Sequence, residues 1–274
     1  EWSLNLCPVV RFLGDEGAHR GNHRRVLKHD IRSFEGGFVT CGSVMEGVDL
    51  VVDEGASCTD QAVTQVAFAA LPDGRTCLCL QYVTVAGDRA ACLIESKDLH
   101  LAVPNDLFNG YRRTVRTAAG ETVLTVPAER DGVVEFPGHW LNIDDRLGVA
   151  ILHGGDDRIL VDRCASRRGG RYRSLFTDEI CAHVRSGATL CPEGEVLADV
   201  GFAVLSGCTA GITARLRGGA VSVSPDGLRG IWVEGADSRR YALVANFGCE
   251  TQTADVFGKR VELVCGTAVI RMDE

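Results

Sequence analysis

The sequence predicts an all-β fold of antiparallel β-sandwiches, in which a large sandwich is followed by a smaller C-terminal one. Short runs rich in Val, Leu, Ile and Thr recur along nearly the whole chain, separated by Gly and Asp, which is typical of short strands joined by turns. Asp-Gly pairs at residues 73–74, 131–132 and 226–227 stand between such runs and favour tight turns. Because few segments of helical period separate the runs, antiparallel sheets are favoured over a doubly wound α/β sheet.

In chain order, the clearest expected strands lie beyond residue 76. They are CLCLQYVTVA (77–86), ETVLTV (121–126), GVAILH (148–153), RILVD (158–162), AGITARL (210–216), AVSVS (220–224), RGIWVE (229–234), YALVANF (241–247), RVELV (260–264) and TAVIR (267–271). One segment, TDEICAHVRSG, is a helix candidate, since Thr177 could begin a helix and Gly187 could end it. The same residues are equally typical of a strand with a polar beginning, and the sequence leaves both interpretations open.

A domain boundary is expected near residues 206–212, where the long alternating segment VLADVGFAVL ends and a series of short strands begins. The predicted large sandwich spans residues 1–205, and the predicted small C-terminal sandwich spans residues 206–274. No internal repeat or low-complexity linker divides the chain further.

The composition argues against two kinds of partner. Lys and Arg total 29 against 37 Asp and Glu, a formal charge of −8, and no segment concentrates enough basic residues to bind a phosphate backbone, so no nucleic acid is expected. No apolar stretch approaches the roughly 20 residues that cross a bilayer, so no membrane partner is expected. Because the chain begins with Glu1, we expect that a segment upstream of it was removed or that these residues belong to a longer polypeptide.

The 12 cysteines are numerous, but their positions favour buried free thiols over a disulfide framework. Cys41, Cys77, Cys79, Cys92 and Cys265 lie inside apolar, strand-like runs, where cysteine behaves as a small hydrophobic residue. Free thiols persist in reducing compartments, so the expected location is the cytoplasm. No CxxC pair is present to suggest zinc, and we expect neither a metal site nor a cofactor.

Several enzyme signatures are absent from the sequence. It has no GxSxG, GxxxxGK[ST], HExxH or strand-to-helix GxGxxG motif, which excludes several common enzyme classes. His19, His23 and His29 recur in HRGNHRRVLKH, but Gly21 and Asn22 disfavour the helix that a metal-binding i, i+4 pair needs. A solvated basic loop is expected there.

The segment LHLAVPNDLFNGYRR predicts a first set of sugar contacts. A strand stops at Pro104, and the loop that follows offers the amides of Asn105 and Asn109 together with the ring of Tyr111. Sugar hydroxyls need such donors and acceptors, and pyranose C–H surfaces pack on aromatic faces. Turn formation is the alternative, because Asn-Asp and Asn-Gly are ordinary turn formers.

The segment HWLNIDDRLG offers a second set of sugar contacts. Trp140 would provide a stacking platform, while Asn142, Asp144 and Asp145 would provide hydrogen bonds, a calcium ligand set or one member of a carboxylate pair. If the segment is extended, its side chains alternate between two faces, so Asn142 and Asp144 point one way and Asp145 the other. The structural alternative is a polar start to a strand, where acidic residues are common and hinder edge pairing.

A catalytic carboxylate pair would need a partner for Asp145 from another segment. Asp178 or Glu179 in SLFTDEI could supply it, at roughly 5–10 Å depending on mechanism, and we assign Asp145 and Glu179 as the pair. The acidic pair at residues 156–157 is interpreted as a solvated hairpin turn between GVAILH and RILVD.

Two stretches resemble parts of known enzymes. RRYALVANFGCETQTADVFGKRVELVCGTAVIRMDE, residues 239–274, resembles the closing β-sandwich of many glycoside hydrolases. HWLNIDDRLGVAIL is similar to strands of the large sandwich domains that accompany catalytic barrels in glycoside hydrolases and polysaccharide lyases. The resemblance covers about a third of the chain and carries over no catalytic residue. Because this sequence lacks the βαβ pattern of a barrel, the resemblance implies that the chemistry lies upstream of Glu1 or in a partner chain.

The sequence leaves three functional hypotheses. In the first, the chain is the β-sandwich portion of a carbohydrate-active enzyme, a glycoside hydrolase, so its partners are a carbohydrate and a catalytic domain that it supports. In the second, it is a self-sufficient sandwich glycosidase or lyase in which Asp145 and Glu179 act as acid and base. In the third, it is a non-catalytic assembly module whose strand edges pair with other subunits, including copies of itself in a homo-oligomer.

Overall fold

The computed structural model confirms the all-β prediction. It describes the backbone of residues 8–13, 19–52, 55–86, 93–126, 132–165, 176–185 and 191–273. Within these ranges the regular elements are strands, apart from a 3₁₀ turn η1 (Leu107–Asn109) and a short helix α1 (Ala210–Thr213). Every strand pairing between described residues is antiparallel.

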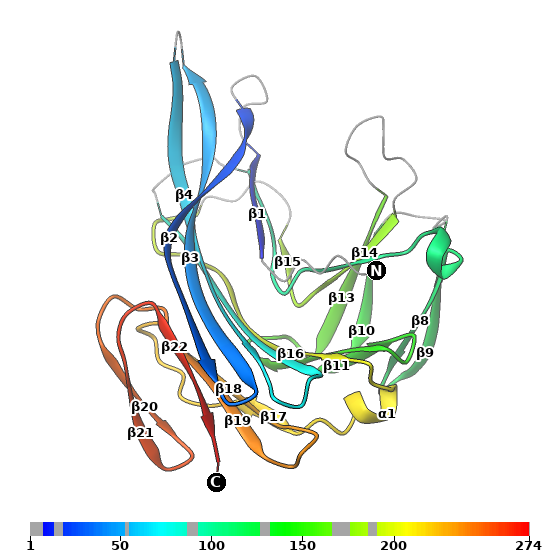
Figure 1. The fold of residues 1–274 in the computed structure, drawn as a ribbon. Helices are drawn as coiled ribbons and strands as arrows, with labels where there is room; N and C mark the ends of the chain where they lie inside the picture. Colours follow the sequence, from blue (N-terminus) through cyan, green and yellow to red (C-terminus); the bar gives the residue numbers. More distant parts are fainter. Residues whose placement is uncertain are drawn as a thin grey trace.

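A long sheet forms the middle layer of the molecule (Figure 1). Among the described residues it has nine strands in the order β2-β3-β4-β5-β16-β12-β11-β8-β9. Their bounds are β2 (His19–Phe34), β3 (Gly37–Val52), β4 (Gly55–Ala70), β5 (Thr76–Val85), β16 (Val196–Ser206), β12 (Leu147–His153), β11 (Trp140–Ile143), β8 (Arg112–Thr117) and β9 (Gly120–Thr125). Because β16 pairs with both β5 and β12, it joins the N-terminal strands to those of the middle of the chain.

Two smaller sheets cover the two faces of the long sheet. The facing sheet consists of β10 (Gly132–Pro137), β13 (Arg158–Ala165), β14 (Phe176–Cys181) and β7 (Leu101–Pro104). The C-terminal sheet consists of β17 (Gly218–Ala220), β18 (Leu228–Glu234), β19 (Arg240–Asn246) and β22 (Thr267–Met272). The remaining strands form a sheet of β1 (Val9–Leu13), β6 (Leu93–Lys97) and β15 (Val184–Arg185), and a ribbon of β20 (Gln252–Val256) and β21 (Lys259–Leu263).

The alternation of side chains along β16 sends neighbouring residues into two different cores. Phe202 packs with Ile180 of the facing sheet in one core, and Leu205 packs with Ile231 of the C-terminal sheet in the other. Because both faces are covered, β16 is buried at nearly every position, and its sequence reads as an almost continuous apolar run.

The C-terminal residues form a small sandwich of their own. Val244 on β19 packs against Val256 and Val261 of the β20–β21 ribbon. On the other side of β19, Leu243 packs in the same core as Leu78 of the long sheet. The small sandwich therefore shares a core with the long sheet, and the domain boundary after residue 205 stays a prediction.

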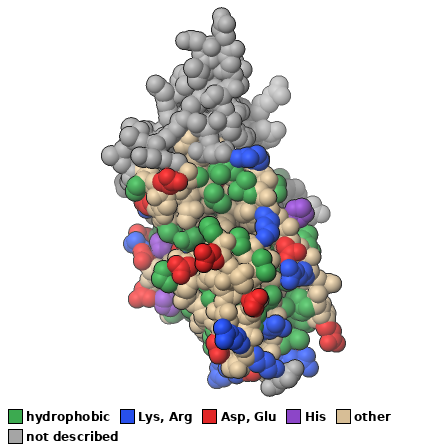
Figure 2. All heavy atoms as spheres, turned by 90° about the vertical axis from the view of Figure 1, so that its left-hand side faces the viewer, with side chains coloured by type: hydrophobic (Ala, Val, Ile, Leu, Met, Phe, Trp, Pro, Cys, Tyr) green, Lys and Arg blue, Asp and Glu red, His purple; other side chains and the backbone are tan. Residues whose placement is uncertain are grey.

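The edge of the long sheet at β2 carries exposed apolar side chains. Val26 is 64% exposed and Ile31 is 69% exposed. Figure 2 shows the face that lies to the left in Figure 1, where hydrophobic side chains gather in the upper part of the described surface and Lys and Arg at its lower end. Lys28 Nζ donates to the carbonyl of Cys265 (2.5 Å), which ties β2 to the segment before β22.

The turn at residues 72–74 forms as predicted. The side chain of Asp73 accepts the main-chain N–H groups of Arg75 (2.9 Å) and Thr76 (2.8 Å), and Gly74 takes a left-handed φ of 67°. Gly227 also has a positive φ, 91°. The pair at residues 131–132 is only partly described, because Asp131 lies outside the described residues.

Residues 210–216, expected as a strand, instead contain the helix α1, and of the strand expected at residues 220–224 only Ala220 lies in a strand, β17. Three further local expectations differ from the structure or are decided by it. Residues 177–181 form a strand, so the strand interpretation of this segment is correct and the helix is wrong. Residues 19–29, expected as a solvated loop, belong to β2, because their main chain pairs with β3 along the edge of the sheet, where Arg25 and Lys28 are exposed. Residues 156–157 are exposed as expected, but they connect the long sheet to the facing sheet and do not close a hairpin.

The cysteines whose side chains the structure describes are free thiols. They are Cys41, Cys77, Cys79, Cys181, Cys191, Cys208, Cys249 and Cys265, while Cys92 lies outside the described residues. Burial raises the pKa of the Cys41 thiol to about 12.

Among the described residues no helix has the length and apolar character that a membrane crossing requires. No group of three or more His, Cys, Asp or Glu side chains in this part of the chain is arranged to hold a metal ion.

The shared core predicts that residues 206–274 unfold together with the long sheet. Ile231→Ala is expected to lower the free energy of unfolding by about 3 kcal/mol, because it leaves a cavity between the two sheets. Urea denaturation of Ile231→Ala should show a single transition, displaced as a whole to lower urea concentration than that of the wild type. Val223→Ala, at a position that is 46% exposed, is the control and should change the free energy by less than about 0.5 kcal/mol. Two transitions, of which only one moves, would contradict the prediction.

Candidate functional site

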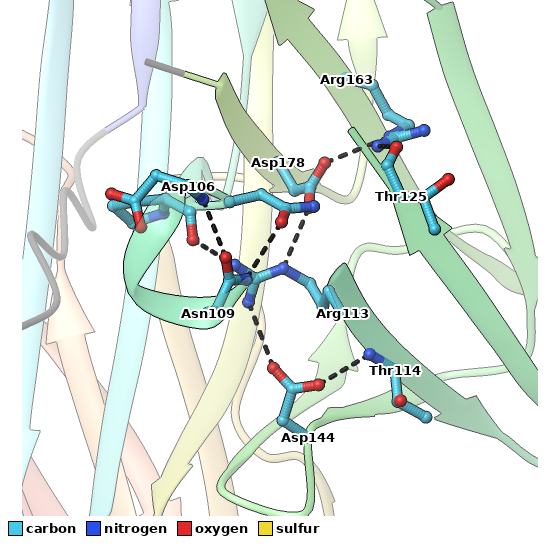
Figure 3. A network of polar contacts seen from close by, with 10 residues as sticks. Asp106, Asn109, Arg113, Thr114, Thr125, Asp144, Arg163 and Asp178 are labelled. Carbon is cyan, nitrogen blue, oxygen red and sulfur yellow. Dashed lines mark hydrogen bonds and ion pairs between the residues drawn. The ribbon is translucent and has the colours of Figure 1, made fainter. Parts of the chain in front are cut away.

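Polar residues predicted in the two sugar-contact segments meet in one ion-pair network (Figure 3). Its centre is Asp178 on β14, which is buried between the facing sheet and the long sheet. Arg113 on β8 donates from Nε to Asp178 Oδ2 (3.0 Å), and Arg163 on β13 donates from Nε to Asp178 Oδ1 (3.2 Å). One carboxylate therefore holds two guanidinium groups, one from each sheet.

Asn105 and Asn109 belong to this network. Asn105 is fully buried and donates from Nδ2 to Asp178 Oδ2 (3.0 Å). Asn109 in η1 donates from Nδ2 to Asn105 Oδ1 (3.0 Å), and its own Oδ1 accepts the main-chain N–H of Asp106 (2.8 Å). The two amides thus fix the loop after β7 to itself and to Asp178. This is the turn role that the sequence left open beside sugar binding.

Asp144 reaches the network from the turn between β11 and β12. Asp144 and Asp145 have left-handed main chains, with φ of 53° and 51°, so the extended strand ends at Ile143 and the expected alternation of faces stops there. Asp144 Oδ1 accepts the main-chain N–H of Thr114 (2.7 Å). Its Oδ2 lies 3.8 Å from Nη1 of Arg113.

The carboxylates of Asp144 and Asp178 thus both lie beside the guanidinium of Arg113, which is almost completely buried. Burial lowers the pKa of Arg113, and the carboxylates of Asp178 and Asp144 counteract this effect. Arg113 also donates from Nη2 to the carbonyl of Pro104. A buried charge needs such partners, since an uncompensated one is strongly destabilising. The arrangement fixes β7, β8, β14 and the β11–β12 turn against one another.

Asp145 and Asn142 hold the segment around α1. Asp145 Oδ1 accepts the main-chain N–H of Ala210 (2.8 Å), and its Oδ2 forms an ion pair with Arg116. The hydrogen bond from Ala210 and the interaction with Arg116 lower the pKa of Asp145. Asn142 is fully buried and donates from Nδ2 to Thr213 Oγ1 (2.9 Å). Both side chains are therefore bound within the fold.

Glu179 points to the opposite face of β14 from Asp178. Lys97 Nζ lies 2.7 Å from Glu179 Oε2 and 2.6 Å from Asp162 Oδ2, and His100 Nε2 lies 3.3 Å from Glu179 Oε2. Burial raises the pKa of Glu179, but the hydrogen bonds and charges of His100 and Lys97 outweigh it and lower the pKa to about 2. Glu179 is therefore an ionised member of a salt-bridge cluster.

Trp140 lines an open hollow of about 380 Å³ beside α1. The same hollow is lined by His139, His153 and Thr213. An indole ring next to hydrogen-bonding side chains suits a saccharide, which has both C–H faces and hydroxyl groups. Of the predicted sugar contacts, Trp140 lies in the wall of this hollow.

Sequence reasoning missed the buried partners of these carboxylates. One signal for Arg113 was present, because it takes an inward position in β8, two residues before the buried Val115. An arginine at an inward position indicates a buried ion pair. For Lys97, and for the pair of Asp98 and His183 described below, no such signal existed, since each contact joins strands that are distant in sequence.

Comparisons with known proteins place the chain in no family. No protein-family model matches it, and no curated protein matches it. Among solved structures, the GH36 α-galactosidase AgaB of Geobacillus stearothermophilus is similar with a TM-score of 0.42 and 8% identity, over 73% of this chain and 30% of that one. The α-galactosidase of Lactobacillus brevis has a TM-score of 0.39 and 8% identity, over 70% of this chain and 28% of that one.

The galactosidase domain of the α-galactosidase-sucrose kinase AgaSK is similar with a TM-score of 0.38 and 10% identity, over 67% of this chain and 27% of that one. The chain spans less than a third of the length of each of these three proteins.

The network around Asp178 predicts a large loss of stability on its neutralisation. Asp178→Asn keeps the shape of the side chain but leaves Arg113 and Arg163 without their shared carboxylate, so the free energy of unfolding should fall by about 3 kcal/mol. Glu135→Gln, which removes an exposed ion pair with Arg158, is the control and should cost less than about 1 kcal/mol. Equal losses in the two variants, measured by urea denaturation, would sink the prediction.

The low pKa of Glu179 predicts a specific acid sensitivity. A carboxylate whose pKa falls from 4.5 to about 2 on folding stabilises the protein fully above pH 4.5, and this stabilisation is lost as the pH falls through 2. The free energy of unfolding of the wild type should therefore exceed that of Glu179→Gln by about 3 kcal/mol at pH 7. This difference should shrink as the pH falls from 4.5 to 2. A difference that does not depend on pH would refute this account. Denaturant titrations across that range measure it.

Proposed function

We propose that this chain is the β-sandwich portion of a carbohydrate-active enzyme, a glycoside hydrolase, and that it supports a catalytic domain located elsewhere. The resemblance of residues 139–152 and 239–274 to sandwich regions of such enzymes supports this role. The antiparallel sheets, which cover one another on both faces of the long sheet, support it as well.

The main support for the proposal is the ionisation and the separate partners of the two predicted catalytic carboxylates, Asp145 and Glu179. A self-sufficient glycosidase needs one carboxylic acid that stays protonated near neutral pH, and this requires a raised pKa. Asp145 and Glu179 both have a lowered pKa. Their partners are also separate, since Asp145 is bound by Arg116 at a turn of the long sheet and Glu179 by Lys97 at the facing sheet. An accessory role agrees with this arrangement better than an acid–base pair does.

The carbohydrate partner is proposed through Trp140. Its place in the wall of the hollow beside α1 suits stacking on a pyranose ring. The assignments of Asn105, Asn109, Asn142 and Asp144 as sugar contacts stay predictions. Asn105, Asn109 and Asp144 make hydrogen bonds inside the protein, and Asn142 donates from Nδ2 to Thr213.

The proposed location is a reducing compartment, the cytoplasm. Its support is the set of free thiols among the described residues, several of which are buried in the two large cores.

A second candidate function, an assembly module, is favoured by the edge of the long sheet. Among the described residues, β2 is the edge strand of the long sheet, and Val26 and Ile31 are exposed on it. Such an edge is a template for pairing with another strand, including a strand of a second copy of the chain.

Hydrolytic activity of the chain alone tests the proposal. The 274-residue chain should give no turnover with a panel of aryl glycosides and oligosaccharides, although circular dichroism shows it to be folded. Asp145→Asn and Glu179→Gln are the matched variants. Turnover that both variants abolish would place the chemistry on this chain and overturn the accessory role. A mass that rises with concentration in sedimentation would favour the assembly alternative.

A further inference from the structure

A second hollow, of about 600 Å³, lies between the sheet of β1, β6 and β15 and the first residues of β16. Its polar lining comes from Ser96, Asp98, His183, Arg185 and Asp199. The buried apolar residues at the start of β16 form another part of its wall. Its size lies in the range of small-molecule sites, which combine an apolar lining with a few fixed polar groups.

His183 and Asp98 form a dyad in the wall of this hollow. His183 Nδ1 lies 2.6 Å from Asp98 Oδ2, and Asp98 Oδ1 accepts the main-chain N–H of His183 (2.6 Å). Asp98 is buried, whereas the side chain of His183 is 41% exposed. The carboxylate fixes the orientation of the imidazole and raises its pKa. Within the described part of the chain, no residue bonds to the second ring nitrogen, Nε2.

The turn that carries Asp98 is held in a strained conformation. Leu99 and His100, which follow it, have left-handed main chains with φ of 59° and 42°, a region that costs residues with a side chain free energy. Gln81 on β5 clamps this turn, because its Oε1 accepts the N–H of Leu99 (2.7 Å) and its Nε2 donates to the carbonyl of Leu99 (3.3 Å). Strain maintained in this way is typical of residues that position a functional group.

Asp199 provides a fixed acceptor in the same hollow. Arg229 donates from Nε to Asp199 Oδ1 (2.7 Å) and lies with Nη2 2.7 Å from Oδ2, and His153 Nε2 lies 3.2 Å from Oδ1. A carboxylate has about four acceptor positions, and this side chain keeps 28% of its surface exposed. The opposing donor, Arg185, is paired with Glu195 (2.7 Å).

Arg185 and Asp199 each pair with a group of opposite charge, and Asp98 is hydrogen-bonded to His183, so the hollow offers directed donors and acceptors whose charges are engaged by partners. We propose that this hollow binds a neutral polyhydroxylated ligand, a saccharide unit, whose hydroxyl groups bond to Nε2 of His183 and to the carboxylate of Asp199. Asp98 is the positioning residue that orients His183. The choice of a saccharide among polyols rests on the proposed function, whereas the site itself rests on the geometry of the lining.

NMR of the histidine rings in the full chain tests this site. The probes are methyl α-D-glucopyranoside, methyl α-D-galactopyranoside, sorbitol and inorganic phosphate. At least one glycoside should shift the His183 ring signals saturably. In His183→Gln, where binding is followed through the ring signals of His153 beside Asp199, the affinity should fall about tenfold, the effect of losing one hydrogen bond. His29→Gln, at an exposed histidine on β2, is the control and should leave the affinity unchanged.

Asp98→Asn tests the positioning role separately. It should return the pKa of His183 toward its ordinary value and weaken glycoside binding, while the thermal unfolding curve reports whether the variant folds. His183→Gln, at a half-exposed position, keeps the test valid if Asp98→Asn does not fold.

Three results would overturn the proposal: no probe shifts His183, phosphate alone shifts it, or His29→Gln weakens binding as much as His183→Gln. If sorbitol binds and neither glycoside does, the assignment of a saccharide is wrong and the hollow is a site for other polyols. Because binding is measured on this chain, the result is independent of turnover, so hydrolysis by the chain would overturn the accessory role and leave the site standing.

Discussion

The burial of the middle of the long sheet on both faces is the constraint on which the rest of the structure depends. Neighbouring residues in the middle of this sheet serve different cores, as Leu78 faces the C-terminal sheet and Cys79 the facing sheet. Removal of apolar surface from water is the dominant favourable contribution to folding, so a sheet with two apolar faces requires two covering layers. The order of the strands in the long sheet follows from this, because β16 must lie in its centre, where both layers reach it.

Where the covering layers meet the ends of the long sheet, apolar packing gives way to charged clusters. Asp178 links the two sheets through Arg113 and Arg163, and Lys97 links Glu179 to Asp162 on the other face of β14. Each carboxylate has a basic partner within the fold, which offsets the cost of removing it from water. These clusters explain why acidic residues that resemble catalytic groups in the sequence act in the structure as connections between strands.

The two hollows meet at Gly154, at the end of β12. A Cβ atom at this position would lie 1.8 Å from the carbonyl oxygen of Asp199, and φ is 72°, so a glycine is required where the chain leaves the long sheet. His153 stands between the hollows, because it lines the hollow of Trp140 and bonds to Asp199 in the wall of the other. The groups that are able to meet a ligand therefore gather beside the connection from the long sheet to the facing sheet.

The sequence by itself determined the all-β class, most of the strands beyond residue 76 and the turn at residues 72–74, because these depend on local alternation and on turn chemistry. Its expected strands at residues 210–216 and 220–224 are wrong, apart from Ala220 at the end of β17. It could not separate helix from strand at residues 177–181, since only pairing with β7 and β13 decides that. It also could not show that Asp145 and Glu179 have separate partners, or that Asp98 meets His183. Tertiary structure alone decides these contacts, because a side chain's partner depends on which strands lie side by side and not on its neighbours in the chain.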